Sequence, residues 1–304
     1  MTTVELDPLL SSLDTRVATE LSSTPEVDDR GQQLDIDKLP ITARKWHKGA
    51  DVVAVFADLK NSSQLGVNMY PQSTASVYEA AVGGVVEILD KFGADYLDIQ
   101  GDAAFGVFWG ERRTERALCA GITIKTFSGS MTARFEKKWP NQPETGFRVG
   151  IAASSVLVKK IGVPRQPGKQ KPVWAGRAVN YASKAGSTAD RHEVVVTGTI
   201  WDRIENNDYL TVSCDCGTGP RDSLWKDVTI ERLRAGDEGD SAGRLLTSDW
   251  CTVHGEEFCR AILDGKRTRS TVSQDLRDSI LASQTENTVR ARARRWRLSG
   301  AGVR

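Results

Sequence analysis

The chain has 304 residues, 39% of them hydrophobic and 27% charged, and its formal net charge is +1. This balance is typical of a folded globular protein and gives no reason to expect nucleic acid as a partner. There is no run of about 18 apolar residues and no secretory signal, so we expect a cytoplasmic protein without membrane contact. The 5 cysteines are too few for a disulfide scaffold.

Hydrophobic periodicity predicts a leader followed by a regular core. Residues 1–45 are polar and interrupted by prolines, and they predict a leader with one short helix near residues 9–21. The core elements expected from the patterns are, in chain order, a strand at 52–59, a helix at 70–92, a hairpin at 94–110, a helix at 114–138, a strand at 147–158, a loop at 162–172, a helix at 176–186 and a strand at 193–197. This β-α-β-β-α-β order predicts an α+β, ferredoxin-like core: an antiparallel sheet with helices on one face.

Beyond residue 205 the patterns are weaker. The expected elements are short strands at 210–212 and 225–233, a Gly- and Asp-rich linker at 235–244, a helix at 250–263 and a helical tail from about residue 270. The chain would then comprise the leader, a core domain at 46–234 and an irregular, mainly helical C-terminal extension at 245–304. The arginine-rich stretch at 289–297 is interpreted as a solvated helix end.

Asp58 and Asp102 are the first candidates for a functional site. Asp58 ends a buried apolar strand and Asp102 lies in a Gly-Asp hairpin turn, positions that meet at one edge of the sheet in a β-α-β-β unit. A carboxylate at the end of a buried strand needs a compensating partner, and a divalent cation is a suitable one. Two cations could neutralise a nucleoside triphosphate for attack on its α-phosphorus. Taken singly, each aspartate is better explained as a turn residue or helix cap, and only the pair favours a site.

Four motifs in this order resemble the class III adenylate and guanylate cyclases. They are Phe56-x-Asp58-Leu59 with Ser62-Ser63, Ile99-x-Gly101-Asp102, Arg148-Val149-Gly150-Ile151, and Gly176-x-x-Val179-Asn180-x-Ala182-Ser183. The resemblance covers about residues 50–200. It implies a ferredoxin-like cyclase core that forms a head-to-tail homodimer, with active sites built from both chains at the interface.

The resemblance also implies how the substrate phosphates are held. Asp58 and Asp102 become the ligands of two Mg²⁺ or Mn²⁺ ions in each active site. The backbone that follows, through Lys60, Asn61 and Ser62, would wrap the terminal phosphates of a nucleoside triphosphate.

Two further residues are implied on the last helix of the resemblance. Asn180 would orient the ribose from the opposite chain. Lys184 stands where the family usually has an arginine that stabilises the transition state, and lysine keeps the charge but loses the two-pronged geometry. Judged by their spacing alone, the two residues are neighbours on a solvated helix face.

Two positions depart from the purine cyclases. The lysine expected four positions before the second metal aspartate is Asp98, and the aspartate expected seven positions before the helix asparagine is Val173. Strand alternation places Tyr96, Asp98 and Gln100 on one face, where base-reading side chains of the family lie. Tyr96 would narrow the pocket, and Asp98 could accept the N3–H of uracil, a donor that neutral cytosine lacks.

These departures are similar to the pyrimidine cyclases of bacterial Pycsar antiphage systems, which Leu39-Pro40, Arg44-x-Trp46 and residues 250–259 also resemble. The resemblance implies synthesis of cyclic UMP from UTP, with CTP as the less favoured substrate, and release of pyrophosphate. The product would signal to a separate cyclic-nucleotide-binding effector. Two alternatives stay open: an adenylate or guanylate cyclase with atypical base recognition, and a cyclase-like domain that senses a nucleotide without turnover.

Cysteine spacing raises a separate question. Cys214-x-Cys216 and Cys251-x-x-His254 could supply four zinc ligands, with Cys259 nearby. The two pairs lie far apart in the sequence and Cys-x-Cys is a less usual half-site. Packing of buried thiols is therefore the favoured interpretation.

Overall fold

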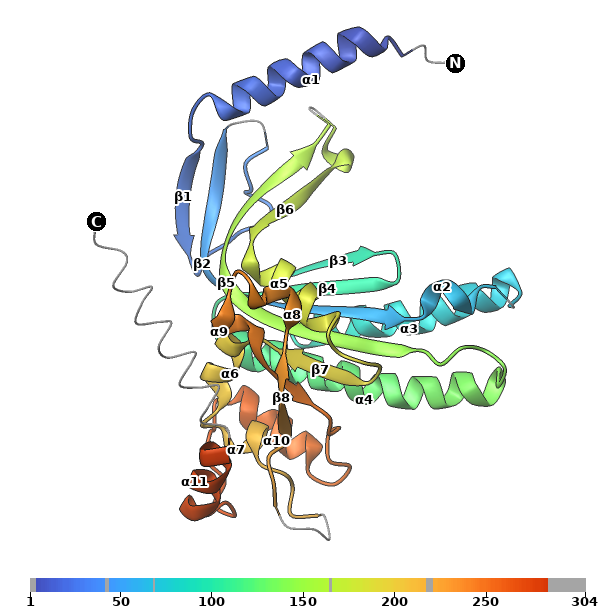
Figure 1. The fold of residues 1–304 in the computed structure, drawn as a ribbon, viewed down its shortest axis with the longest axis vertical. Coiled ribbons are helices and arrows are strands. Elements are labelled where there is room, and N and C mark those ends of the chain that lie inside the picture. Colours follow the sequence, from blue (N-terminus) through green and yellow to red (C-terminus); the bar gives the residue numbers. More distant parts are fainter. Residues whose placement is uncertain (1–3, 42–43, 68, 164–165, 217–220, 284–304) are drawn as a thin grey trace. The chain divides into compact units, whose positions relative to one another are not determined.

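The computed structural model describes residues 4–41, 44–67, 69–163, 166–216 and 221–283 (Figure 1). The chain divides into two compact units. The smaller unit comprises residues 1–50 and 155–175, and the larger unit comprises residues 51–154 and 176–304. Two long strands contribute residues to both units.

The described strands and helices follow in chain order. The strands are β1 (Glu26–Gly31), β2 (Lys45–Lys60), β3 (Tyr96–Gln100), β4 (Ala103–Phe108), β5 (Gly146–Gly162), β6 (Gln170–Gly176), β7 (Glu193–Val196), β8 (Trp225–Thr229) and β9 (Ala242–Leu246). The helices are α1 (Leu6–Leu21), α2 (Ser62–Leu65), α3 (Pro71–Lys91), α4 (Arg113–Lys138), α5 (Arg177–Gly186), α6 (Gly198–Ile204), α7 (Asp208–Thr211), α8 (Glu231–Arg234), α9 (Glu238–Ser241), α10 (Gly255–Leu263) and α11 (Gln274–Ser283), with a 3₁₀ turn, η1, at Pro167–Lys169.

The smaller unit contains α1, β1, β6 and the adjoining ends of β2 and β5. The expected helix near residues 9–21 is confirmed as α1, which has no buried residues. Strand β1 pairs in parallel with the start of β2, and β6 pairs with the end of β5. The loop expected at 162–172 is therefore shorter than predicted, because β6 begins at Gln170 and finds its partner in β5.

The larger unit is built on a mixed sheet with the strand order β3-β4-β2-β5-β7-β9-β8. The expected β-α-β-β-α-β order is confirmed by β2, α3, β3, β4, α4 and β5. Strand β4 lies antiparallel to both β2 and β3, and β9 lies antiparallel to both β7 and β8. The sheet differs from the expected all-antiparallel one because β5 and β7 run parallel.

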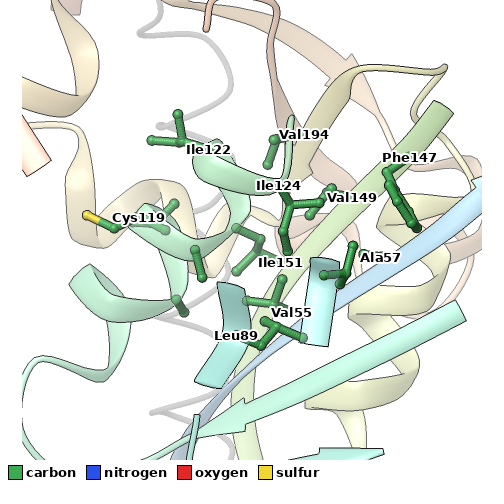
Figure 2. Close-up of a cluster of buried hydrophobic side chains, with 14 of the residues drawn as sticks. Val55, Ala57, Leu89, Cys119, Ile122, Ile124, Phe147, Val149, Ile151 and Val194 are labelled. Atoms are coloured by element: carbon green, nitrogen blue, oxygen red, sulfur yellow. The ribbon is translucent and has the colours of Figure 1, made fainter. Parts of the chain in front are cut away.

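Helices α3 and α4 cover one face of this sheet and enclose the main core (Figures 1 and 2). The core takes alternate residues from the strands, among them Val55 and Ala57 of β2, and Val149 and Ile151 of β5. Leu89 of α3 joins them and is fully buried. This alternation is what a strand with one face on a helical layer requires, and it leaves the intervening residues of β2 and β5 on the opposite face.

Helix α5 packs on that opposite face, which departs from the expectation of helices on one face only. The contact is so close that a Cβ atom on Gly150 would lie 1.9 Å from the Ala182 carbonyl oxygen and 2.2 Å from the Gly186 nitrogen. Only glycine therefore lets β5 approach the α5 backbone. A second, smaller core of Ala185, Ala189, Val195, Ile230 and Leu233 seals this face.

The C-terminal part agrees with the sequence patterns in some elements and differs in others. Strand β8 confirms the first part of the strand expected at 225–233, but the remainder is wrong because α8 begins at Glu231. Helices α10 and α11 are confirmed, although α10 begins at Gly255 and not at residue 250. The strand expected at 210–212 is wrong, because the Asn207 side chain accepts the Tyr209 N–H and begins the helical turn α7. The linker expected at 235–244 is also wrong, since it contains α9 and the start of β9. The arginine-rich stretch at 289–297 lies outside the described residues, and none of the described helices is long and apolar enough to cross a membrane.

The close contact at Gly150 predicts a strong response to a single methyl group. Gly150→Ala should lower the free energy of unfolding by about 2 kcal/mol or more, because backbone on the helix side cannot move aside. Gly129→Ala is the matched control, because a Cβ on this residue of α4 meets nothing within 4 Å. The control should raise stability by about 0.5–1 kcal/mol through its helix propensity. Denaturant unfolding of both variants tests this. Equal free energies of unfolding for Gly150→Ala and wild type would contradict the close packing of α5 on β5.

Candidate active site

The register between β2 and β4 brings the two candidate metal ligands to the same place. Asp58 pairs with Ala103, and Asp102 is the residue that precedes Ala103 in the hairpin turn. The turn is possible because Gly101 adopts a positive φ of 68°, in the left-handed region that glycine tolerates best. Both aspartates are partly buried. The structure thus brings together the backbone positions of the two aspartates that the sequence singled out.

Ser62 forms a hydrogen bond with one of these aspartates, whereas the side chains of Lys60 and Asn61 bind other residues. The Ser62 hydroxyl donates to Oδ2 of Asp102 at 2.5 Å. Lys60 forms an ion pair with Asp190, with 2.5 Å between Nζ and Oδ1. Asn61 adopts a left-handed conformation (φ 59°), and its side-chain amide donates to a backbone carbonyl at 2.8 Å. Of the three residues expected at the phosphates, only Ser62 has its side chain at the aspartates.

Arg148 is a site residue that sequence reasoning noted only as part of a motif. Its Nε donates to Oδ2 of Asp58 at 2.6 Å, and its Nη2 lies 2.5 Å from the same oxygen. The guanidinium compensates the charge of the half-buried carboxylate. The available signal was the strand alternation, because Arg148 lies between the core residues Phe147 and Val149 and must face the other way.

An aromatic surface continues from Asp58 along the same sheet face. The register pairs Phe56 with Phe105, and Phe105 with Asp98. The rings of Phe56 and Phe105 stack with 6.5 Å between their centroids, and the Tyr96 ring lies 6.0 Å from Phe105. Tyr96 and Asp98 therefore share one face with Asp58, as the strand alternation predicts.

Tyr96 and Asp98 form a polar pair at the edge of this surface. Burial of the phenol raises the pKa of Tyr96 to about 12, and the charge of Asp98 and a hydrogen bond to it act in the same direction. The phenol is thus a hydrogen-bond donor at neutral pH, and Asp98 accepts from it. Asp98 Oδ1 also accepts the backbone N–H of Ile99 at 3.0 Å.

The remaining candidates lie on α5 and stand apart from the aspartates. Asn180 is exposed, and its side-chain amide donates to the Gly176 carbonyl oxygen at 2.9 Å. The Lys184 Nζ lies 5.5 Å from the centroid of the Tyr181 ring. Among the residues that the structure describes, no hydrogen bond or ion pair joins Asn180 or Lys184 to Asp58 or Asp102.

Comparison with known proteins gives the class of this fold and site. Residues 46–216 match the family described as adenylate and guanylate cyclase catalytic domain, and the chain belongs to this family. The expected resemblance is confirmed. A solved class III adenylyl cyclase-like ATP-binding protein from Pseudomonas aeruginosa has a similar fold, with a TM-score of 0.51 and 13% identity over 72% of this chain and 48% of that chain.

Two relatives are similar over most of their length. A protein named uridylate cyclase, from Micromonospora echinofusca, is 57% identical over 96% of this chain and 95% of that protein. Another protein of the same name, from Propioniciclava tarda, is 46% identical over 88% of this chain and 87% of that protein.

The raised pKa of Tyr96 predicts a stability contribution that is lost only in strong alkali. The folded state holds the phenol proton more tightly than the unfolded chain. The contribution is therefore complete below pH 10.0 and is lost as the pH rises towards about 12. Denaturant unfolding should show a difference in the free energy of unfolding between wild type and Tyr96→Phe. This difference should be constant below pH 10.0 and should shrink above it. A phenolate titration of the same pair that finds Tyr96 ionised at pH 10.0 or below would contradict this assignment.

Proposed function

We propose that this chain is a uridylate cyclase, which converts UTP to 3′,5′-cyclic UMP and pyrophosphate. The observation that carries the proposal is the β2–β4 register, which puts Asp58 opposite the residue that follows Asp102 and on the same sheet face as Asp98. The names of the relatives at 57% and 46% identity support the same substrate. In the reaction the 3′-oxygen forms a bond to the α-phosphorus, the bond to the β-phosphate oxygen breaks, and the hydroxyl proton is released.

Asp58 and Asp102 are proposed to hold two Mg²⁺ or Mn²⁺ ions. Their carboxylate oxygens, with the Ser62 hydroxyl beside Asp102, form the hard oxygen donor set that these cations prefer. When bound, the ions supply positive charge to the triphosphate and polarise the 3′-hydroxyl. Ser62 holds the Asp102 carboxylate, and Arg148 orients that of Asp58. The backbone of residues 60–62 is proposed to receive the terminal phosphates.

Base recognition is proposed to rest on Asp98 and Tyr96. Asp98 accepts the N3–H of uracil while Tyr96 donates to the same carboxylate and fixes its orientation. Phe105, the strand partner of Asp98, is buried against Phe56 and Tyr96, so one side of this carboxylate is lined by an aromatic surface. A base that offers no donor to Asp98 would lose this hydrogen bond and bind less well. CTP is the second candidate, since the amino group of cytosine could also donate to Asp98.

Asn180 and Lys184 are proposed to act on the substrate held by a second copy of the chain. Within one chain Asn180 donates to Gly176, the residue before α5, and Lys184 lies over the Tyr181 ring, so neither side chain is bonded to the aspartates. A head-to-tail homodimer supplies the missing groups, with Asn180 at the ribose and Lys184 at the α-phosphate. Lys184 contributes positive charge to the transition state.

The wider role of the activity rests on the resemblance described above. We propose that the product signals in antiphage defence, through a separate effector that binds the cyclic nucleotide. The division into a leader at 1–45, a cyclase domain at 46–234 and an extension at 245–304 stays a prediction, as does a cytoplasmic location. A nucleotide sensor without turnover is disfavoured because both carboxylates are present and supported by partners.

Activity assays with purified protein test the reaction and its two carboxylates. Wild type with Mn²⁺ or Mg²⁺ should convert UTP faster than CTP, ATP or GTP. Asp58→Asn and Asp102→Asn should each lower kcat/KM by about 100-fold or more, since each removes charge that the substrate phosphates need. Asp90→Asn, at an exposed position near the end of α3, is the control and should leave kcat/KM unchanged. Thermal unfolding verifies that all variants fold.

Three results would each refute one part of this proposal. Cyclisation of ATP alone would refute the pyrimidine substrate. Absence of a cyclic product from every nucleotide with either cation would refute the activity. Full activity of Asp58→Asn or Asp102→Asn would place the site elsewhere.

Subunit mixing tests the shared active site. Asp102→Asn and Asn180→Ala proteins should each be nearly inactive alone. In a mixed dimer one site carries both substitutions and the other carries neither, so unfolding and refolding an equal mixture should restore about a quarter of wild-type activity. Asp102→Asn mixed with the double variant Asp102→Asn, Asn180→Ala is the control and should stay inactive. Absence of recovery in the first mixture, with mixed dimers verified by mass spectrometry, would show that both residues act within one chain.

A further inference from the structure

Four potential metal ligands converge at a second place in the larger unit, away from the residues of the cyclase site. Cys214 and Cys216 follow α7, and Cys251 and His254 precede α10. Their ligand atoms all lie within 4.8 Å of one another. The sequence favoured the packing of buried thiols, and this interpretation is wrong, because Cys216 is exposed and the three sulfur atoms gather around the ring of His254.

The distances fit a tetrahedral ion. The sulfur atoms of Cys214 and Cys216 each lie 3.1 Å from Nδ1 of His254. Zinc with Zn–S bonds of about 2.3 Å and Zn–N bonds of about 2.0 Å sets tetrahedral ligand atoms roughly 3.5–3.8 Å apart. The spacing lies between the two 3.1 Å contacts and the 4.8 Å limit of the cluster, so small side-chain movements reach it. Three sulfurs and one imidazole are the Cys₃His donor set of structural zinc sites.

The backbone around Cys251 is arranged to support a thiolate. The N–H groups of Val253 and His254 both point to the Cys251 sulfur, with N···S distances of 3.4 Å. The Gly255 N–H donates to the Cys251 carbonyl oxygen at 2.7 Å and closes the turn. Donors aimed at a sulfur stabilise its negative charge, which a metal ligand must carry.

Arg269 contacts residues next to both halves of the cluster. Arg269 is 5% exposed, and its Nη2 donates to Asp215, between the first two cysteines, at 2.9 Å. The guanidinium carbon also lies 4.6 Å from the centroid of the Phe258 ring, and Phe258 stacks on His254 at 5.7 Å. Contacts of this kind, made by residues that do not bind the metal themselves, orient metal ligands and are common in metal sites of proteins.

The fifth cysteine is not part of the cluster. Cys259 forms a side-chain hydrogen bond with the buried Cys119 of α4. It therefore provides a cysteine on α10 itself, close in sequence to the cluster, whose removal should leave the four ligands intact.

We propose that Cys214, Cys216, Cys251 and His254 bind one structural zinc ion that fastens the segment after α7 to the start of α10. All four ligands are supplied by protein side chains, so the site is closed and has no position for a reacting water. The Trp250 indole N–H, just before the cluster, donates to Thr123 of α4 at 2.9 Å. The ion would thus reinforce the attachment of the C-terminal segment to the core helix and would take no part in cyclisation.

Metal analysis of the full-length protein, purified without chelators, tests the site. Wild type should contain about one zinc ion per chain, and Cys216→Ser and His254→Ala should contain less than about one tenth of that. Cys259→Ser is the matched cysteine control and should keep its zinc. Asp102→Asn should keep it as well, which separates this site from any ion at the cyclase aspartates. Failure of the proposed cyclase activity would leave these expectations unchanged.

Two measurements on wild type test the site even if the cysteine and histidine variants fold poorly. Wild type reconstituted with Co²⁺ should show the thiolate-to-metal absorption of a tetrahedral site, and Cys259→Ser should show the same spectrum. A zinc-specific chelator should lower the unfolding temperature of wild type, and added Zn²⁺ should restore it. Zinc-free wild type that fails to take up Zn²⁺ under reducing conditions, or equal zinc in wild type and Cys216→Ser, would overturn the proposal.

Discussion

The antiparallel register between β2 and β4 is the constraint on which the proposed active site depends. It sets Asp58 opposite Ala103 and therefore beside Asp102, and it sets Phe56 opposite Phe105. The hairpin from β3 to β4 extends the same face to Asp98. Because side chains alternate along a strand, a slip by one residue would turn Asp58 into the core and Ala57 out of it. The apolar layer formed with α3 and α4 makes such a slip costly and so maintains the position of the carboxylates.

One face of the sheet forms the hydrophobic core and the other carries the proposed site. One face carries the main core against α3 and α4, and the other carries Asp58, Arg148 and the aromatic surface. Helix α5 lies on this second face because Gly150 allows its backbone to approach β5 directly. The same helix carries Asn180 and Lys184, whose side chains do not reach the aspartates of their own chain. An active site shared between two copies reconciles these positions with their proposed roles.

Local patterns predicted some elements well and others poorly, for physical reasons. The helix α3 and the hairpin at Gly101-Asp102 depend on periodicity and turn chemistry, which neighbouring residues determine. Strand β9 was missed because its stability comes from pairing with β7 and β8, whereas its Gly- and Asp-rich approach is typical of a linker. The turn α7 was missed because the Asn207 cap outweighs the β-propensity of the residues that follow.

The cyclase motifs, the two aspartates and the shared face of Tyr96 and Asp98 could all be identified from the sequence, because each depends on spacing within one strand, turn or helix. Which distant residues meet could be known only from the folded chain. Arg148 reaches Asp58 because β5 is the neighbour of β2 in the sheet. Cys214 and Cys216 reach His254 because folding brings the residues after α7 to the start of α10. Spacing along the chain cannot reveal such contacts, since they depend on how strands and helices pack after the intervening segments have folded.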